Sequence, residues 1–276
     1  VYQDTTDNLG YGDAKITFGG VAGMYDIYLG ADGSPVDAID DVTPSAYEEA
    51  NGSGSGTYTS NDIGDKAGQM GIGAKVSLPI LGALNYKYYY NADSAKPSDN
   101  ASSGDQNGTT GSAYSATLTT NAGDLPVIGS FLDGATLRLG VSETDHSQTA
   151  NVDDAFDVTA ALNYTYGQLK VGAQMGVQLT GNASLAGTAT NADWYKNTYF
   201  GAAYAVNDSL SVSYGRTDSR KKTTGGTGVT TEIDGYSVSY TTGGLTIAIA
   251  QNEADNADYT TGRNRTGNSI LLSVAF

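Results

Sequence analysis

Apolar and polar residues alternate with a period of two along much of this chain, and the stretch FDVTAALNYTYGQLKVGAQMGVQL shows the pattern best. From Phe156 to Tyr166 every second residue is apolar or aromatic, and the residues between them are mostly polar or small. After a Gly-Gln pair the alternation resumes and continues to Leu179. A period of two is that of a strand with unlike faces, and a short Gly-containing pair can join two strands tightly. The sequence therefore predicts a long hairpin over residues 156–179.

The same alternation recurs along the rest of the chain and predicts an antiparallel meander. The other alternating stretches are 13–19, 70–78, 84–90, 137–141, 200–206, 210–214, 245–249 and 269–276. Tight turns alternate with long loops rich in Asp, Asn, Gly, Ser and Thr, which are residues that favour turns and solvent. These loops are 94–111, 180–193, 219–229 and 254–265. Short connections at one end and long ones at the other describe an up-and-down sheet.

Strand length and the character of the polar face distinguish a soluble sandwich from a membrane barrel. Strands of a sandwich usually run about five or six residues, whereas several strands here run about ten or more, as a tilted bilayer-spanning strand requires. Aromatic residues gather near strand ends, where an interfacial girdle would lie; ordinary β-propensity is the alternative explanation. They are Tyr90, Tyr114, Tyr166, Trp194, Tyr195 and Tyr240. We therefore predict that the apolar face meets lipid and the polar face lines a lumen.

Composition narrows the functional classes. The chain has 37 Gly and 20 Tyr but only 5 Phe, no Cys and one His, His146. These counts exclude Cys-ligated metals and thiol nucleophiles, and His146 has no convincing Ser partner, so we expect no enzymatic activity. The net charge of −16 excludes a general nucleic-acid-binding surface. No apolar run is long enough for a transmembrane helix. The chain begins at Val1 rather than Met, which we interpret as a processed or incomplete chain.

Three segments resemble the general diffusion porins of Gram-negative bacteria. The final stretch NSILLSVAF resembles their closing strand, and EIDGYSVSYTTGGLTIAIAQNEADN resembles their penultimate hairpin. GYGDAKITFGGVAGMYDIYLG resembles the porin segment in which a strand leads into loop three, which folds into the barrel and narrows the pore. The resemblance implies a homotrimer in the bacterial outer membrane, in contact with lipid and lipopolysaccharide. It also implies that the terminal Phe276 belongs to the signal read by the barrel-assembly machinery.

The fold class that we predict is all-β, a single transmembrane antiparallel up-and-down β-barrel domain spanning residues 1–276. Antiparallel barrels of this kind have an even number of strands. We expect 16 strands, with the first three absent from this sequence. The alternative is a complete barrel of 14 strands, in which 9–19 and 21–31 pair as a hairpin around Gly19-Gly20.

The resemblance also places a pore-constricting loop at about 21–65. The usual Pro-Glu-Phe-Gly-Gly stretch of the family is not present, and Pro44 with the Glu48-Glu49 pair only loosely fills its place. The acidic residues expected in this loop are Asp26, Asp32, Asp37, Asp40, Asp41, Glu48 and Glu49.

Strand parity points a set of basic residues into the lumen, opposite the acidic loop. They are Lys15, Lys75, Lys87, Arg138 and Lys170. Opposed charges in a narrow wet pore create a transverse field that acts on polar solutes; alternatively, each cation pairs with a nearby carboxylate and has a structural role only. We expect a passive channel for ions and small hydrophilic solutes with a weak cation preference. A substrate-selective channel, for example for sugars, is the alternative, because Tyr89 and Tyr199 fall on the inner face. We expect no cofactor, although acidic loops such as 252–258 offer oxygen ligands for Ca²⁺.

Overall fold

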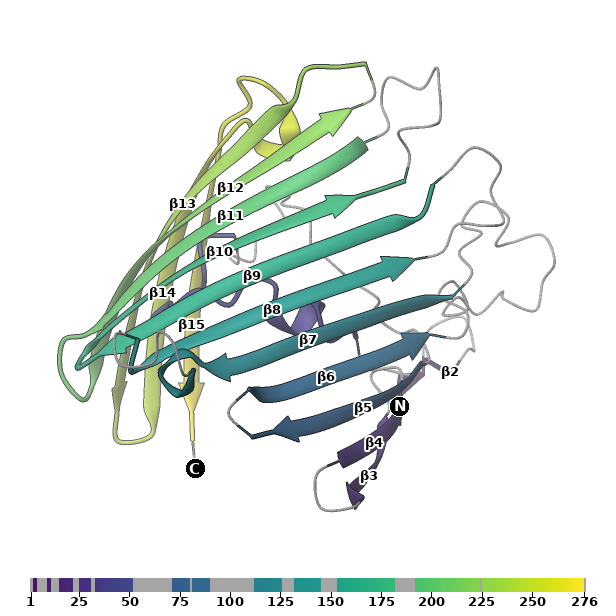
Figure 1. Cartoon of the computed structure of the whole chain (residues 1–276). Coiled ribbons are helices and arrows are strands. Elements are labelled where there is room, and N and C mark those ends of the chain that lie inside the picture. The colour runs from purple at the N-terminus through teal and green to yellow at the C-terminus, as the bar shows by residue number, and fades with distance from the viewer. Residues whose placement is uncertain are drawn as a thin grey trace.

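The computed structural model describes residues 2–3, 9–10, 15–21, 25–30, 33–51, 71–79, 81–89, 112–125, 132–144, 153–181, 192–223 and 225–275. Figure 1 shows one large curved sheet of tilted strands, with short turns joining neighbouring strands along one end. None of the helical segments in these residues has the length and hydrophobicity of a membrane-spanning helix.

Thirteen antiparallel strands form this sheet, and each strand pairs with its neighbours in sequence, in the order β15-β14-β13-β12-β11-β10-β9-β8-β7-β6-β5-β4-β3. The strands are β3 (Lys15–Val21), β4 (Tyr25–Gly30), β5 (Gly71–Leu78), β6 (Gly82–Tyr89), β7 (Ala113–Asn121), β8 (Ala135–Thr144), β9 (Ala155–Tyr166), β10 (Leu169–Leu179), β11 (Ala192–Ala205), β12 (Leu210–Thr223), β13 (Val229–Thr242), β14 (Leu245–Asp255) and β15 (Arg265–Val274). A separate two-stranded sheet contains β1 (Tyr2–Gln3) and β2 (Leu9–Gly10). Short 3-10 helices are η1 (Asp37–Ile39), η2 (Ala122–Asp124) and η5 (Ala257–Tyr259).

The predicted hairpin over 156–179 is confirmed, and so is its phase. Strands β9 and β10 pair from Leu169 opposite Tyr166 to Leu179 opposite Phe156. Leu169 and Leu179 are 42% and 46% exposed, while Gln174 on the opposite phase is buried. Since the apolar residues point out and the polar ones point in, hydrophobic burial inside the sheet is not what holds this fold together. Continuous backbone pairing along the strands has that role.

The strand count differs from the prediction in an informative way. The described sheet has two edges, β3 and β15, and neither is paired with a further strand within the described residues. Because thirteen antiparallel strands place the first and last in the same direction, closing the barrel antiparallel takes an odd number of further strands. The predicted total of 16 would require three, and the alternative of 14 would require one. The all-β up-and-down architecture is confirmed.

The predicted start of the constriction loop is wrong. Residues 25–30 form strand β4, which pairs with both β3 and β5. The hairpin of 9–19 with 21–31, proposed for the 14-stranded alternative, is therefore present in shorter form. Asp26 belongs to this strand rather than to a loop, and its carboxylate accepts a hydrogen bond from the backbone N of Gly20 at 3.0 Å.

Candidate functional site

Residues 33–51, called here the inner segment, cross one face of the large sheet. The contacts of this segment run from β6 at one side to β15 at the other. We call the face that it covers the inner face, and the face that carries the exposed apolar side chains the outer face. The inner segment is part of the loop predicted at 21–65; residues 52–65 of that loop and Asp32 lie outside the described residues.

The first part of the inner segment is held by β6 and β7. Lys87 Nζ and Tyr89 OH both donate to the carbonyl O of Gly33, at 3.0 and 2.8 Å. The backbone N of Val36 donates to Ser115 Oγ at 3.1 Å. Lys87 is almost wholly buried, with its ammonium 4.9 Å from the centre of the Tyr89 ring. This lysine therefore anchors the segment and does not project freely into a lumen.

The middle of the segment is bound by two amide side chains of the wall. Gln174 Oε1 accepts from the backbone N of Val42 at 3.0 Å, and Gln174 Nε2 donates to Asp40 Oδ1 at 2.9 Å. Asn163 Nδ2 donates to the carbonyl O of Val42 at 2.7 Å. Both Val42 backbone groups are therefore satisfied by the wall, as a strand partner would satisfy them.

The last part of the segment reaches the C-terminal strands. Its wall partners are two serines on β12 and β13, an asparagine on β14 and a serine on β15. Ala46 N donates to Ser213 Oγ at 2.9 Å, Tyr47 N to Ser237 Oγ at 3.1 Å, Ser269 Oγ to Glu48 Oε2 at 2.9 Å, and Asn252 Nδ2 to Ala50 O. The segment is thus fastened along its whole length, mostly through small polar side chains.

A row of glycines gives the segment room to lie against the wall. Four glycines are register partners on β10 to β13: Gly172, Gly201, Gly215 and Gly235. A Cβ on Gly201 would lie 2.7 Å from the carbonyl O of Pro44, and one on Gly235 would lie 2.6 Å from the Cα of Ala50. Both distances are shorter than van der Waals contact allows. The absence of a side chain along this row therefore sets how far the segment stands from the wall.

The inner segment has a strong charge imbalance. It contains five carboxylates, Asp37, Asp40, Asp41, Glu48 and Glu49, and no Lys or Arg. Burial, together with the nearby Asp41 and Asp40 carboxylates, raises the pKa of Glu49 to about 8. Glu49 Oε2 is buried and has no hydrogen-bond partner among the described residues. At neutral pH this carboxyl is therefore mostly neutral. The Glu48-Glu49 pair, which the sequence predicts to carry two negative charges, then carries close to one.

The other predicted cations lie on the inner phase but in different settings. Lys15 Nζ lies 4.4 Å from the centre of the Tyr28 ring. Lys75 is exposed and is the register partner of Asp26, while Arg138 pairs in register with Thr119 and Ala161. Lys170 is exposed and pairs in register with Thr165, which lies one residue before β9 ends at the tight turn. These positions agree with the predicted phase, but the structure does not gather all five cations opposite the inner segment.

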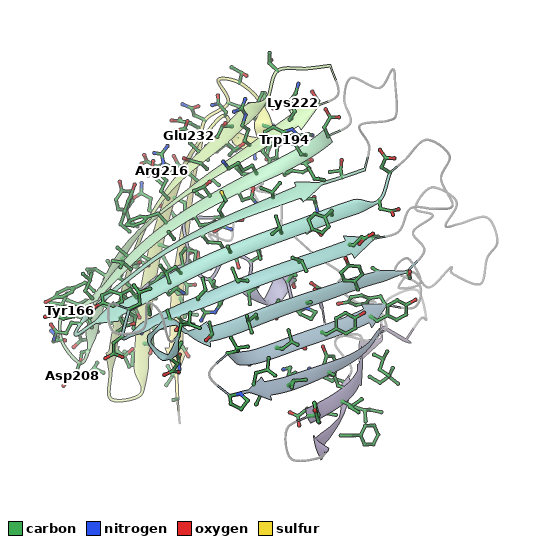
Figure 2. All side chains as sticks on the ribbon, in the orientation of Figure 1. Tyr166, Trp194, Asp208, Arg216, Lys222 and Glu232 are labelled. Carbon is green, nitrogen blue, oxygen red and sulfur yellow. The ribbon has the colours of Figure 1, made fainter. Side chains whose placement is uncertain are left out.

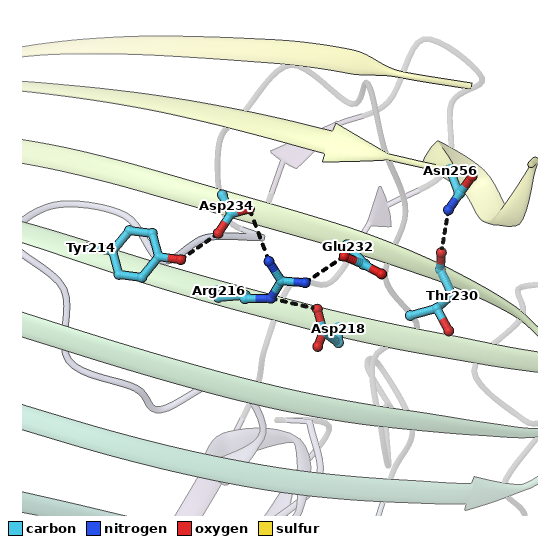
Figure 3. A network of polar contacts seen from close by, with 7 residues as sticks. All are labelled: Tyr214, Arg216, Asp218, Thr230, Glu232, Asp234 and Asn256. Carbon is cyan, nitrogen blue, oxygen red and sulfur yellow. Dashed lines mark hydrogen bonds and ion pairs between the residues drawn. The ribbon is translucent and has the colours of Figure 1, made fainter. Parts of the chain in front are cut away.

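The outer face carries charge only over part of its extent. Arg216 on β12 pairs with Asp218 at 3.0 Å and with Glu232 and Asp234 on β13 at 2.5 and 3.3 Å (Figure 3). Tyr214 OH donates to Asp234 at 2.5 Å, and the Tyr214 ring lies 5.3 Å from that of Tyr236. An aromatic pair beneath a band of paired charges is the pattern expected where lipid tails give way to polar head groups.

Aromatic and charged residues also lie near the two ends of the strands. Figure 2 shows Tyr166 and Asp208 at the tight-turn end of the sheet and Trp194 and Lys222 toward the opposite end. Arg216 and Glu232 lie between them but nearer the latter.

The acidic loop considered for Ca²⁺ is occupied by ion pairs at its end. Asp258 Oδ2 lies 2.9 Å from Arg263 and 3.2 Å from Arg265. Within the part of the chain that the structure describes, no group of three or more acidic or histidine side chains is arranged to hold a metal ion.

The residues that hold the inner segment against the wall were not predicted from the sequence. Gln174, Asn163 and the serines were interpreted only as a hydrophilic face, Asn252 as part of the acidic stretch 252–258 considered for Ca²⁺, and the glycines as small lumen residues. All of these residues lie on the inner phase of their strands, and the four glycines fall in one row when the strands are paired in register. Register is therefore the information that would have identified them. The terminal Phe276 lies outside the described residues.

Solved structures resemble this fold, although no protein-family model matches the chain and no curated protein matches its sequence. A porin matches with a TM-score of 0.57 and 13% identity, over 90% of this chain and 78% of that one. An anion-selective porin from Comamonas acidovorans matches with a TM-score of 0.55 and 11% identity, over 92% and 75%. Salmonella typhi OmpF in complex with daunomycin matches with a TM-score of 0.60 and 12% identity, over 90% and 76%. The fold is that of the outer-membrane porins.

Proposed function

We propose that this chain forms a water-filled channel in the bacterial outer membrane for passive diffusion of ions and small hydrophilic solutes. The observation that carries the proposal is the inner segment, because a strap of chain fastened across the polar face of a barrel wall narrows a lumen without filling it. The exposed apolar outer face supports a lipid environment, with lipopolysaccharide at the charged band near Arg216. Passive diffusion requires no chemistry at the site, so the proposal includes no catalytic role.

A weak cation preference is part of the proposal. The charged side chains of the inner segment are all acidic, and Lys87, which donates to Gly33 O at its start, is buried. Screening limits each charge to about 8 Å at physiological salt, so the segment dominates the field where the lumen is narrowest. Because Glu49 is mostly neutral at neutral pH, Glu48 and the aspartates supply most of this field.

Planar-bilayer recordings test both parts of the proposal. Wild-type protein is expected to form open channels whose reversal potential in a KCl gradient indicates cation preference. Glu48→Gln should move the reversal potential toward anions, whereas Asp255→Asn, an exposed carboxylate at the end of β14, should leave it unchanged. Absence of channels would refute the function. Anion preference in wild type, or a larger effect of Asp255→Asn, would refute the placement of the selective charges.

The alternative of a sugar-selective channel depended on two inner-face tyrosines. Tyr89 and Tyr199 are 0% and 1% exposed. Tyr89 OH donates to Gly33 O, and Tyr199 OH accepts a hydrogen bond from Asn197 Nδ2 at 2.9 Å. Rings covered in this way offer no stacking surface to a passing sugar, which supports general diffusion.

We also propose a homotrimer assembled in the membrane with the help of the barrel-assembly machinery. The outer face of β3 and β4 is strongly apolar, with Ile16 and Phe18 60% and 63% exposed and Leu29 46% exposed. This face would pack against a neighbouring copy. Native mass spectrometry of the detergent-extracted protein should report trimers, and a Phe18→Asp variant should shift the population to monomers. Only monomers in wild type would contradict this assembly.

A further inference from the structure

A lysine and two tyrosines meet on the inner face near the end of β12 that lies opposite the tight turns. Tyr195 on β11 is the register partner of Lys221 on β12, and Lys221 has the same phase as Ser213, which holds the inner segment. The ring of Tyr259, from η5, lies 5.6 Å from that of Tyr195. Lys221 Nζ lies 5.8 and 5.7 Å from the centres of these two rings. Figure 2 shows the next residue, Lys222, toward this end of the sheet.

Hydrogen bonds to two hydroxyls of the wall hold Tyr259 in this position. Its backbone N donates to Thr231 Oγ1 at 3.1 Å, and its OH lies 2.7 Å from Ser219 Oγ. Ser219 Oγ donates its hydrogen to Asn197 Oδ1 at 2.6 Å, so Tyr259 OH is the donor to Ser219. The aromatic surface against which Lys221 lies is therefore fixed at both its backbone and its ring.

The surroundings of Lys221 carry excess positive charge. Tyrosine rings have no net charge, so they position the ammonium without neutralising it. None of the ion pairs among the described residues includes Lys221. Asp258 pairs with Arg263 at 2.9 Å and with Arg265 at 3.2 Å. Three cations against one carboxylate give a local sum of +2, which stays positive if Asp193 on the neighbouring strand is added.

A small polar cavity lies beside this ammonium. It has a volume of about 140 Å³ and is lined by Lys221, Thr223, Thr227, Val229, Asp258 and Tyr259. A water molecule occupies about 30 Å³, so the cavity has room for about five water-sized atoms. That size suits a tetrahedral oxyanion and is too small for a sugar. The Lys221 ammonium and the hydroxyls of Thr223 and Thr227 are groups that donate to such an anion.

We propose that this cavity binds a small oxyanion of the phosphate class, held by Lys221 Nζ and the hydroxyls of Thr223 and Thr227. The local positive sum attracts a dianion, and Asp258 repels it little because two arginines neutralise that carboxylate. The site lies on the inner face, so its occupant comes from the water of the lumen and not from a membrane lipid. The inference goes beyond the proposed channel and rests on it only for its role, which is to hold phosphate at one mouth of the lumen.

This anion site is compatible with a cation preference set by the inner segment. Ala50 of that segment packs against Gly215, and Lys221 lies six residues further along β12. At about 3.3 Å per residue the two positions are about 20 Å apart. Screening limits each charge to about 8 Å at physiological salt, so Lys221 does not act on the field at the segment.

Phosphate binding to the purified protein tests the site directly. Inorganic phosphate is titrated against the protein in a phosphorus-free detergent at physiological salt, and the phosphorus NMR line width reports the bound fraction. Broadening should be saturable with the wild type. Lys221→Met, which keeps the length of the side chain and removes its charge, should weaken binding about ten-fold or more, the loss expected for one hydrogen bond between charged partners. Lys221→Arg, which keeps the charge, should retain binding.

The matched control is Lys196→Met, which removes the same charge from the outer phase of β11 and should leave phosphate binding unchanged. No saturable broadening with the wild type, or binding that survives Lys221→Met, overturns the site. Equal losses in the Lys221 and Lys196 variants also overturn it, because phosphate then follows the overall charge of the protein. A loss in Lys221→Arg as large as in Lys221→Met overturns the role of the positive charge. The measurement needs no open channel, so failure of the site leaves the proposed channel intact, and absence of channels in bilayers leaves the binding result standing.

Discussion

Replacing Gly201 by Ala should lift the inner segment off the wall. The added Cβ would lie 2.7 Å from the carbonyl O of Pro44 and 2.8 Å from Thr43 Cβ. Restoring an ordinary contact of 3.4 Å takes a displacement of about 0.7 Å. The wall at this row is backbone already paired on both sides, so the segment must move and not the strand. Overpacking of this kind costs about 1–3 kcal/mol of the free energy of unfolding.

Gly215→Ala is the matched control, one strand away in the same register row. Its Cβ would meet nothing closer than Ala50 Cβ at 3.3 Å. Because the clash is slight, we expect its stability to equal that of the wild type or to exceed it by up to about 1 kcal/mol through a less flexible unfolded chain.

Two measurements apply to this pair of variants. Denaturant unfolding in detergent gives the stability difference, and planar-bilayer recording gives single-channel conductance. Gly201→Ala should lower both, since Thr43 and Pro44 are pushed toward the pore axis, whereas Gly215→Ala should leave conductance unchanged. Equal conductance in both variants and wild type would show that the glycine row does not set the position of the inner segment.

Three other predictions concern charge. The pKa of Glu49 is raised to about 8, so a change from about pH 7 to about pH 9 ionises this carboxyl and adds negative charge to the inner segment. The cation preference of the channel should therefore increase over this pH range. Reversal potentials of Glu49→Gln should not change with pH in this way, and a pH response retained in this variant would exclude Glu49 as its source. Val171→Arg on the outer face should cost about 2–4 kcal/mol of barrel stability, measured by unfolding in lipid vesicles, and a neutral effect would mean that this face does not meet lipid. Arg216→Met should lower the free energy of unfolding by about 1 kcal/mol, because three carboxylates lose a shared partner whose side chain is 39% exposed. The difference from wild type should be smaller at high salt. No difference at low salt would show that the network has no net stabilising effect.

Strands and their faces could be predicted from the sequence because alternation is a local property. The hairpin over 156–179 required only the period and a Gly-containing turn. Strand β4 was predicted only in the 14-stranded alternative, although YDIYLG does alternate, because its inner phase carries Asp26 and the aromatic Tyr28, which blurs the contrast between faces. The resemblance to a porin loop then assigned the stretch wrongly.

The seating of the inner segment could not be predicted, because it depends on partners distant in sequence. Gln174 lies 134 residues from Asp40, and Ser269 lies 221 residues from Glu48. Spacing carries no information about such pairs until the strand register is known. The raised pKa of Glu49 was missed for the same reason, since it follows from burial beside Asp41 and Asp40 and not from any adjacent residue.

The inner segment also has a consequence for the order of folding. It follows β4 in sequence, yet its partners include Ser213 on β12, Ser237 on β13 and Ser269 on β15. Contacts between residues so far apart form late, because the intervening chain must first be ordered. Early in assembly, therefore, only the contacts with β6 and β7 can hold the start of the inner segment, and its full seating waits for the last strand. Narrowing of the pore by the inner segment is then the final step of barrel formation. A narrowed pore therefore indicates that all the strands that this segment contacts are in place.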